Sequence, residues 1–281
     1  MKIRSTVLLL VFLALPITAQ KKDSTILNKW IPSAVAGFNI SQLALSNWSQ
    51  GGENSLTWTL TGDFSYNYQG NDIEVKNNLR LAYGRTKLGS EDFKTNNNDF
   101  YLESVILKKI DFPVDPYFSN TVRTSLTIGY NYGTTPKTEI VNFFDPGYVT
   151  QSIGFYYEPN KEFNTRLGIG VEEVFTRNNT KYADNKSTPK IEKSGIEAGI
   201  ESVTSLKKLV AENLLLKSKL RLFTRFNSLD VWDVRWDNTI VAKINGFLNV
   251  NFTFLLVYQQ DQSLKTQIKQ GLQLGFVYTI L

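Results

Sequence analysis

Strict alternation of apolar and polar residues is the feature that most restricts the fold of this chain. From Leu56 to Tyr68 the even positions hold Leu, Trp, Gly, Phe or Tyr, and the odd positions hold Thr, Asp, Ser or Asn. Side chains of a strand point alternately to opposite faces, so this period predicts a strand with one apolar and one polar face. The pattern returns at residues 122–132, 163–172, 248–258 and 268–280, and no helical stripe is comparable. The sequence therefore predicts an all-β fold.

The length and number of the alternating segments favour a membrane barrel. We predict strands at residues 36–46, 55–68, 74–87, 97–109, 118–132, 148–158, 162–177, 192–204, 213–227, 231–244, 247–260 and 265–280. Several are longer than the roughly five or six residues of most strands in soluble proteins. Strands of about nine to eleven residues suffice to cross a bilayer. The expected fold is a transmembrane antiparallel β-barrel of about 12 strands, and a soluble β-sandwich is the alternative.

Connections between these strands alternate in length. The expected short turns are residues 69–73, 110–117, 159–161, 205–212 and 245–246, and the loops between them are longer on average. Outer-membrane barrels have short periplasmic turns and longer outer loops. Asn245 and Gly246 predict a two-residue type I′ turn, which needs positive φ at both positions.

The first residues read as an export signal. Lys2 and Arg4 precede an apolar run over residues 7–16, and Ala19 is followed by Gln20. This order predicts a signal peptide over residues 1–19. We expect residues 20–35 to form a periplasmic N-terminal segment and residues 36–281 to form a barrel in the bacterial outer membrane.

The first predicted strand has the weakest alternation. Phe38 and Ile40 lie on one parity, whereas Leu43 and Leu45 lie on the other. A β-bulge near Gln42 would reconcile the two parities. The alternative is that this segment is a plug inside the barrel rather than part of its wall.

Composition excludes several kinds of site. The chain has no cysteine and no histidine, so disulfides, thiolate metal sites and imidazole-based catalysis are excluded. Its 31 Lys and Arg residues against 26 Asp and Glu make nucleic acid a poor partner. Glu172 with Glu201 could serve as acid and base, but lumenal ion pairing explains them equally well. We expect no enzyme activity, no cofactor and no metal site.

Charged residues on the polar face are expected to line the lumen: Arg80, Arg123, Arg166, Glu197, Glu201, Lys217, Lys219, Arg221, Arg225 and Arg235. Charges removed from water must be paired to avoid a large desolvation cost, so a structural network that fills the lumen is the first interpretation. The functional alternative is a basic wall that favours anionic solutes in a narrow pore.

A loop sequence carries a family resemblance. Residues 47–55 contain Trp48, Gly51 and Gly52, and residues 83–84 and 144–148 agree with the same pattern. The sequence resembles a Bacteroidota outer-membrane family catalogued as a domain of unknown function. The resemblance implies an outer-membrane barrel without an assigned activity. Asn98 stands where that family tends to have an acid, which argues against a paired-carboxylate metal site there.

The glycines permit backbone conformations closed to other residues, and an indole can anchor a loop by packing. A tight connection between the first two strands is therefore the simplest interpretation of Gly51, Gly52 and Trp48. The alternative is a loop folded into the lumen, where Trp48 and Gln50 would narrow a passage.

The C-terminal residues Gly275, Tyr278 and Ile280 resemble the terminal signal read by the outer-membrane insertion machinery. The expected partners are this machinery, outer-membrane lipid and a small solute. We expect passive passage or binding of a small solute. The alternatives are a closed structural or surface-interaction barrel without transport, and a lipid carrier with an opening in its wall.

Overall fold

The computed structural model describes residues 28–47, 49–185, 187–259 and 263–281 and is all-β, with a closed antiparallel barrel. Its twelve strands are β1 (Lys29–Leu43), β2 (Ser55–Gln69), β3 (Ile73–Leu88), β4 (Lys94–Lys108), β5 (Asp115–Thr124), β8 (Gly147–Asn160), β9 (Phe163–Phe175), β10 (Ser194–Ala211), β11 (Leu214–Arg225), β12 (Ser228–Lys243), β13 (Leu248–Gln259) and β14 (Ser263–Thr279). The predicted fold class is confirmed. The predicted signal peptide, residues 20–27 and Trp48 lie outside the described residues.

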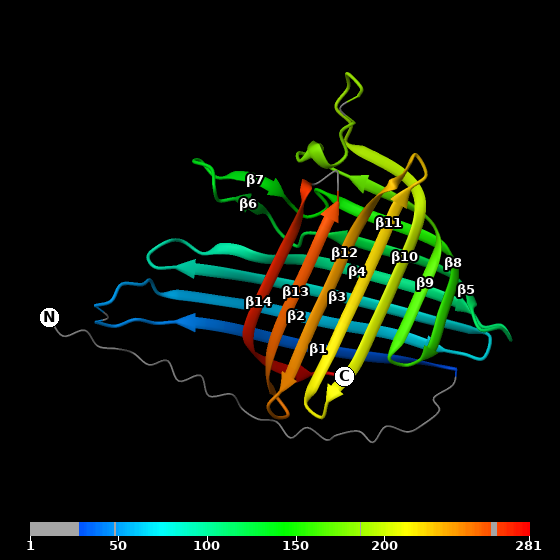
Figure 1. The fold of residues 1–281 in the computed structure, drawn as a ribbon, viewed down its shortest axis with the longest axis horizontal. Helices are drawn as coiled ribbons and strands as arrows, with labels where there is room; N and C mark the ends of the chain where they lie inside the picture. Colours follow the sequence, from blue (N-terminus) through cyan, green and yellow to red (C-terminus); the bar gives the residue numbers. More distant parts are fainter. Residues whose placement is uncertain (1–27, 48, 186, 260–262) are drawn as a thin grey trace.

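The barrel strands follow one another in chain order around the wall, and β1 closes the barrel by pairing with β14. Figure 1 shows β1–β4 running almost perpendicular to the steeper β10–β14, with β5, β8 and β9 at one side. Strands β6 (Gly129–Asn131) and β7 (Thr138–Val141) form a separate hairpin between β5 and β8. A short 3-10 helix, Thr180–Tyr182, lies between β9 and β10. In the described part of the chain, no helix is long and apolar enough to span a bilayer.

Except for an apolar cluster inside one end of the barrel, apolar side chains mostly point outward and polar side chains mostly point inward. Ile153 is 60% exposed and Leu167 is 59% exposed, whereas the adjacent Ser152 and Arg166 are 2% and 4% exposed. This arrangement is the reverse of a soluble protein, and it matches barrels whose outer surface contacts lipid. Trp30 stacks on Tyr66 with ring centroids 4.6 Å apart, and both are exposed at one end of the wall. Interfacial aromatic girdles occupy such positions.

The two ends of the barrel differ. One end, the short-turn end, carries the connections β2–β3, β4–β5, β8–β9, β10–β11 and β12–β13. The other connections lie at the opposite end, the long-loop end. Inward-facing Val105, Leu107, Tyr117 and Tyr156 form an apolar cluster near the short-turn end. Leu107 has no exposed surface. The interior is therefore packed with apolar groups at this end.

The first strand is part of the wall. β1 pairs with β2 without interruption from Lys29 to Leu43, so neither the bulge near Gln42 nor the plug is present. The strand begins at Lys29 rather than at residue 36, and Leu45 lies beyond its end. Leu43 is the last residue of the strand and Leu45 follows it, so the mixed parity is confined to the end of β1.

The predicted strand over residues 118–132 was too long. β5 ends at Thr124, whose hydroxyl donates to Pro146 O at 3.0 Å and accepts from Phe144 N at 2.7 Å. The amide of Asn98 then holds the turning chain, since its Oδ1 accepts from the backbone N–H groups of Leu126 and Thr127 at 2.9 Å each. Alternation continues past the turn because residues 129–131 form β6 of the separate hairpin.

Two predicted turns were also wrong. Residues 205–211 belong to β10, which pairs with β11 as far as Ala211↔Leu214, so the turn itself contains only Glu212 and Asn213. Asn245 and Gly246 do not have positive φ. Instead, Asn245 Oδ1 accepts from the N–H groups of Phe247 and Leu248 at 3.0 and 2.8 Å. An Asx-type turn replaces the predicted type I′ turn.

Candidate functional site: the charged network in the lumen

Glu103 on β4 is the centre of one part of the network. Its Oε1 accepts from Arg166 Nη2 at 2.8 Å and from the Tyr101 hydroxyl at 2.9 Å. Its Oε2 accepts from Lys219 Nζ at 2.6 Å, and Lys219 also donates to Tyr101 at 2.7 Å. These residues come from β4, β9 and β11, so the ion pairs join opposite walls of the barrel.

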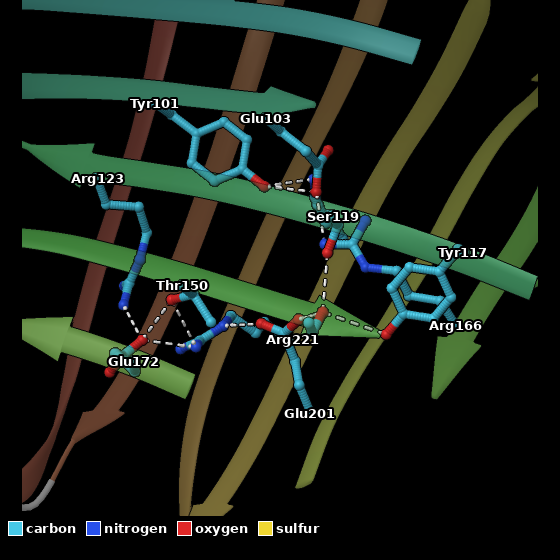
Figure 2. Close-up of polar contacts among 12 residues, drawn as sticks. Tyr101, Glu103, Tyr117, Ser119, Arg123, Thr150, Arg166, Glu172, Glu201 and Arg221 are labelled. Atoms are coloured by element: carbon cyan, nitrogen blue, oxygen red, sulfur yellow. Dashed lines mark hydrogen bonds and ion pairs between the residues drawn. The ribbon is translucent and has the colours of Figure 1, made fainter. Parts of the chain in front are cut away.

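Arg221 on β11 is the centre of a second part, drawn in Figure 2. Its Nη2 donates to Glu172 Oε2 at 2.6 Å and its Nε donates to Glu201 Oε1 at 2.8 Å. Arg123 and Thr150 also donate to Glu172, at 3.2 and 2.8 Å. Each carboxylate is buried and is paired with a cation, as the desolvation cost of burying charges requires.

A third part connects β3 and β4 to β12. Arg80 Nη2 lies 3.6 Å from Asp237 and 3.9 Å from Asp99. Arg235 contacts the same two carboxylates, at 2.9 Å from Asp237 and 3.6 Å from Asp99. Cations and carboxylates alternate here, so neither sign dominates.

Most of the lumen residues predicted from the sequence enter this network: Arg80, Arg123, Arg166, Glu201, Lys219, Arg221, Arg225 and Arg235. Arg225 pairs with Asp233 at 3.1 Å. Glu197 is half-buried at the long-loop end and forms no ion pair with a described residue. Lys217 is exposed near the short-turn end and lies outside the network. The arrangement favours ion pairing over a continuous basic wall.

Sequence reasoning missed Asp99, Tyr101 and Glu103, the acidic side of the network on β4. These three residues have odd numbers, as do the inward Val105 and Leu107 of the same strand. This shared parity could have shown that they face the lumen. The strand shows no clean alternation, because its inward face is polar at one end and apolar at the other.

The network side chains of β3, β9, β11 and β12 surround a small cavity. A cavity of about 10 Å³ lies among residues that include Arg80, Arg123, Arg166, Arg221 and Asp237. A cavity of roughly this size holds about one water molecule. Among the described residues, no three acidic side chains are grouped so that they could hold a metal ion.

The loop sequence singled out from the resemblance lies outside the lumen. Gly51 and Gly52 have φ values of 81° and 123°, which confirms that the loop needs their conformational freedom. Residues 49–54 are exposed, and Leu45 N donates to Asn54 Oδ1 at 2.6 Å across the loop. The described residues of this loop, including Gln50, therefore form an exposed connection at the long-loop end, and the alternative that Trp48 and Gln50 narrow a passage stays a prediction.

Asp145 joins two long loops at the same end. Its carboxylate accepts from the backbone N–H groups of Arg177, Asn178 and Asn179 at 2.8, 2.9 and 3.1 Å. Burial raises the pKa of Asp145, but these donated hydrogen bonds outweigh burial and hold the pKa below its ordinary value. Asp145 thereby holds residues 177–179, at the start of the loop after β9, against the loop before β8.

Comparison with known sequences supports part of the resemblance. Residues 40–130 match the family model described as protein of unknown function (DUF3078). The DUF3078 match includes all of β2 to β5, the loop with Gly51 and Gly52, and the network residues Glu103 and Arg123. It confirms, for these residues, the predicted likeness to a domain of unknown function. No curated protein matches the chain.

Solved structures show a distant likeness. An outer membrane channel from Pseudomonas putida F1 has a TM-score of 0.41 and 10% identity, over 94% of this chain and 99% of that chain. The translocator domain of the autotransporter NalP from Neisseria meningitidis has a TM-score of 0.37 and 10% identity, over 91% of this chain and 90% of that one. These values are too low to transfer a function from either protein.

Proposed function

We propose that this chain is an outer-membrane β-barrel with a closed lumen, which holds a surface for interaction at the long-loop end rather than passing solutes along its axis. Its outward apolar side chains, even number of strands and short-turn end are the features that outer-membrane barrels combine. Outer-membrane lipid is then the partner of the outward face, and the insertion machinery is the proposed partner of residues 275–280.

The packing of the network carries this proposal. Glu103 contacts Lys219 across the lumen, Arg80 contacts Asp237, and the cavity between them measures about 10 Å³. Passage of a hydrated solute would require several of these ion pairs to separate. Leaving buried charges without partners is costly, so the closed state is strongly favoured.

The interaction surface is supported by hydrogen bonds that join two of the long loops. Asp145 holds residues 177–179 by three backbone hydrogen bonds, and Phe143 is 58% exposed beside Phe144, with ring centroids 6.0 Å apart. Tyr130 and Tyr132 lie on the neighbouring hairpin segment, 6.2 Å apart. Exposed aromatic side chains on ordered loops are typical of protein interaction surfaces.

Single-channel recording in planar bilayers tests the closed lumen. We expect the wild-type barrel to show no ion-conducting steps, and a variant that removes three network side chains, Arg80→Ala, Glu103→Ala and Lys219→Ala, to show small steps. Protein recovered from the bilayer vesicles serves as the control for folding and insertion. Stable conductance of the wild type would replace this proposal with passive passage of a small solute.

A further inference from the structure

The wall of the barrel is incompletely paired where it closes. β1 and β14 share six residue pairs, from Val35↔Thr279 to Ile40↔Leu274. Among the described residues, the rest of β14, Ser263–Gln273, pairs with β13 alone. Figure 1 shows β14 (red) turning away from β1 (blue) beyond their shared segment. One strand edge in the half of the barrel near the long loops therefore faces outward without a neighbouring strand.

A groove lies where the pairing stops. It has a volume of about 460 Å³ and is lined by residues 40–42 of β1, residues 272–274 of β14 and Val250 of β13. Ligand sites of proteins have volumes of roughly 300 to 1,000 Å³. Free backbone groups do not face hydrocarbon without a partner, because each costs several kcal/mol. In a bilayer this groove needs an occupant that offers polar groups as well as apolar surface.

The lining of the groove changes from apolar to polar across the wall. Leu272 is 64% exposed and Leu274 is 38% exposed on the outward face. On the inward face, Gln273 Nε2 donates to Thr59 Oγ1 at 3.4 Å. Four residues along the same face, Lys269 Nζ donates to Asn97 Oδ1 at 3.1 Å. Apolar surface for an acyl chain thus lies next to polar groups that reach into the barrel.

Lys269 supplies the charge that selects the occupant. It is exposed, and it forms no ion pair with any side chain that the structure describes. An anionic group that enters the opening would meet this ammonium group. Lysine on a free strand edge also disfavours pairing with a further strand, and β14 has Lys265 and Lys269 in the unpaired stretch. The ammonium group of Lys269 favours an anionic lipid as the occupant. The two lysines on the strand edge disfavour a strand of a second copy.

We propose that the opening between β1 and β14 binds one anionic lipid of the surrounding leaflet. The acyl chain lies against Ile40, Leu272 and Leu274, and the phosphate of the headgroup pairs with Lys269 inside the wall. This inference rests on the membrane location proposed above. It does not require passage along the barrel axis, since the lipid enters from the side.

Native mass spectrometry of the detergent-solubilised full chain tests the proposal, with phosphatidylglycerol, phosphatidylcholine or glycerol phosphate added. We expect one phosphatidylglycerol per barrel, weaker binding of phosphatidylcholine, and no binding of glycerol phosphate alone. Lys269→Gln should weaken phosphatidylglycerol binding about fivefold, because one lysine near an anionic lipid surface strengthens binding by about this factor. Lys217→Gln, an exposed lysine on β11, is the matched control and should leave binding unchanged.

An engineered disulfide between β1 and β14 would close the opening and test its role directly. Continuing the register beyond Ile40↔Leu274 places Ser41 opposite Gln273, and the chain has no cysteine of its own. Oxidised Ser41→Cys with Gln273→Cys should lose phosphatidylglycerol binding, and reduction should restore it. Equal binding by the oxidised and reduced forms, equal binding by Lys269→Gln and wild type, or a dimer in place of the lipid adduct would overturn the proposal. A chain that stays soluble without detergent would instead retire the membrane location.

Discussion

Lys219 Nζ lies 2.6 Å from Glu103 Oε2, and the two residues come from β11 and β4 on facing walls of the barrel. On the shorter way round the closed sheet, four strands separate β11 from β4: β10, β9, β8 and β5. The contact therefore spans the lumen rather than the surface of one sheet. It shows that ion pairs hold the two walls together.

Breaking this pair should destabilise the barrel strongly. Lys219→Met removes one cation from a buried carboxylate, which costs about 3 to 5 kcal/mol of unfolding free energy. The double variant Lys219→Met with Glu103→Gln should lose less than the sum of the single changes, because the two side chains contact each other directly and each single change already removes that contact. Urea unfolding in lipid vesicles measures these values.

The matched control for this cycle is Lys208→Met. Lys208 and Glu162 form an exposed ion pair at 4.0 Å, and such pairs contribute roughly 0 to 1 kcal/mol. If Lys219→Met costs no more than Lys208→Met, the lumenal pairs are solvated and the closed lumen is wrong.

A charge on the outward face tests the lipid contact. Ile169 is 56% exposed near the middle of β9, and Ile169→Arg should cost about 2 to 4 kcal/mol in a bilayer. Ile191→Arg, in the loop before β10, replaces an isoleucine that is 65% exposed and should be nearly neutral. Unfolding of both variants from the same vesicles gives the comparison. Equal small costs would place the outward face of β9 in water.

Asp145 should make the order of the long loops depend on pH. Its pKa is held below the ordinary value, so its stabilising effect is present above the unfolded-state pKa and is lost as pH falls through the lower, folded-state pKa. We expect the amide resonances of Arg177 and Asn179 to report this titration by NMR in micelles. Asp145→Asn should abolish the titration and speed hydrogen exchange of residues 176–179 at neutral pH. A midpoint at or above the ordinary aspartate value would contradict the hydrogen-bonded carboxylate.

The fold was largely predictable because the wall strands have a mostly apolar outward face and a mostly polar inward face. Thirteen alternating residues from Leu56 to Tyr68 predict β2, and the structure extends the predicted strand over residues 55–68 by Gln69 alone. Turns were harder, since Asn245 uses its side chain to cap the backbone instead of adopting positive φ. Local sequence does not distinguish these two ways of making the turn.

The network was predictable by residue but not by partner. Arg166 and Arg221 were expected inside, yet their carboxylate partners depend on which strands face each other across the lumen. Glu103 lies 63 residues from Arg166 in the chain and meets it only after the barrel closes. The opening beside β14 has the same origin, because the alternation of residues 268–280 does not reveal how many of them pair with β1.

Thiol labelling of a Ser152→Cys variant tests the closed lumen most directly, because Ser152 faces inward, is buried, and the chain contains no other cysteine. In lipid vesicles, a charged, water-soluble thiosulfonate should modify this cysteine far more slowly than a cysteine placed at the exposed loop residue Ser187. Similar labelling rates at the two positions would mean that water reaches the middle of the barrel, and the closed lumen would have to be abandoned.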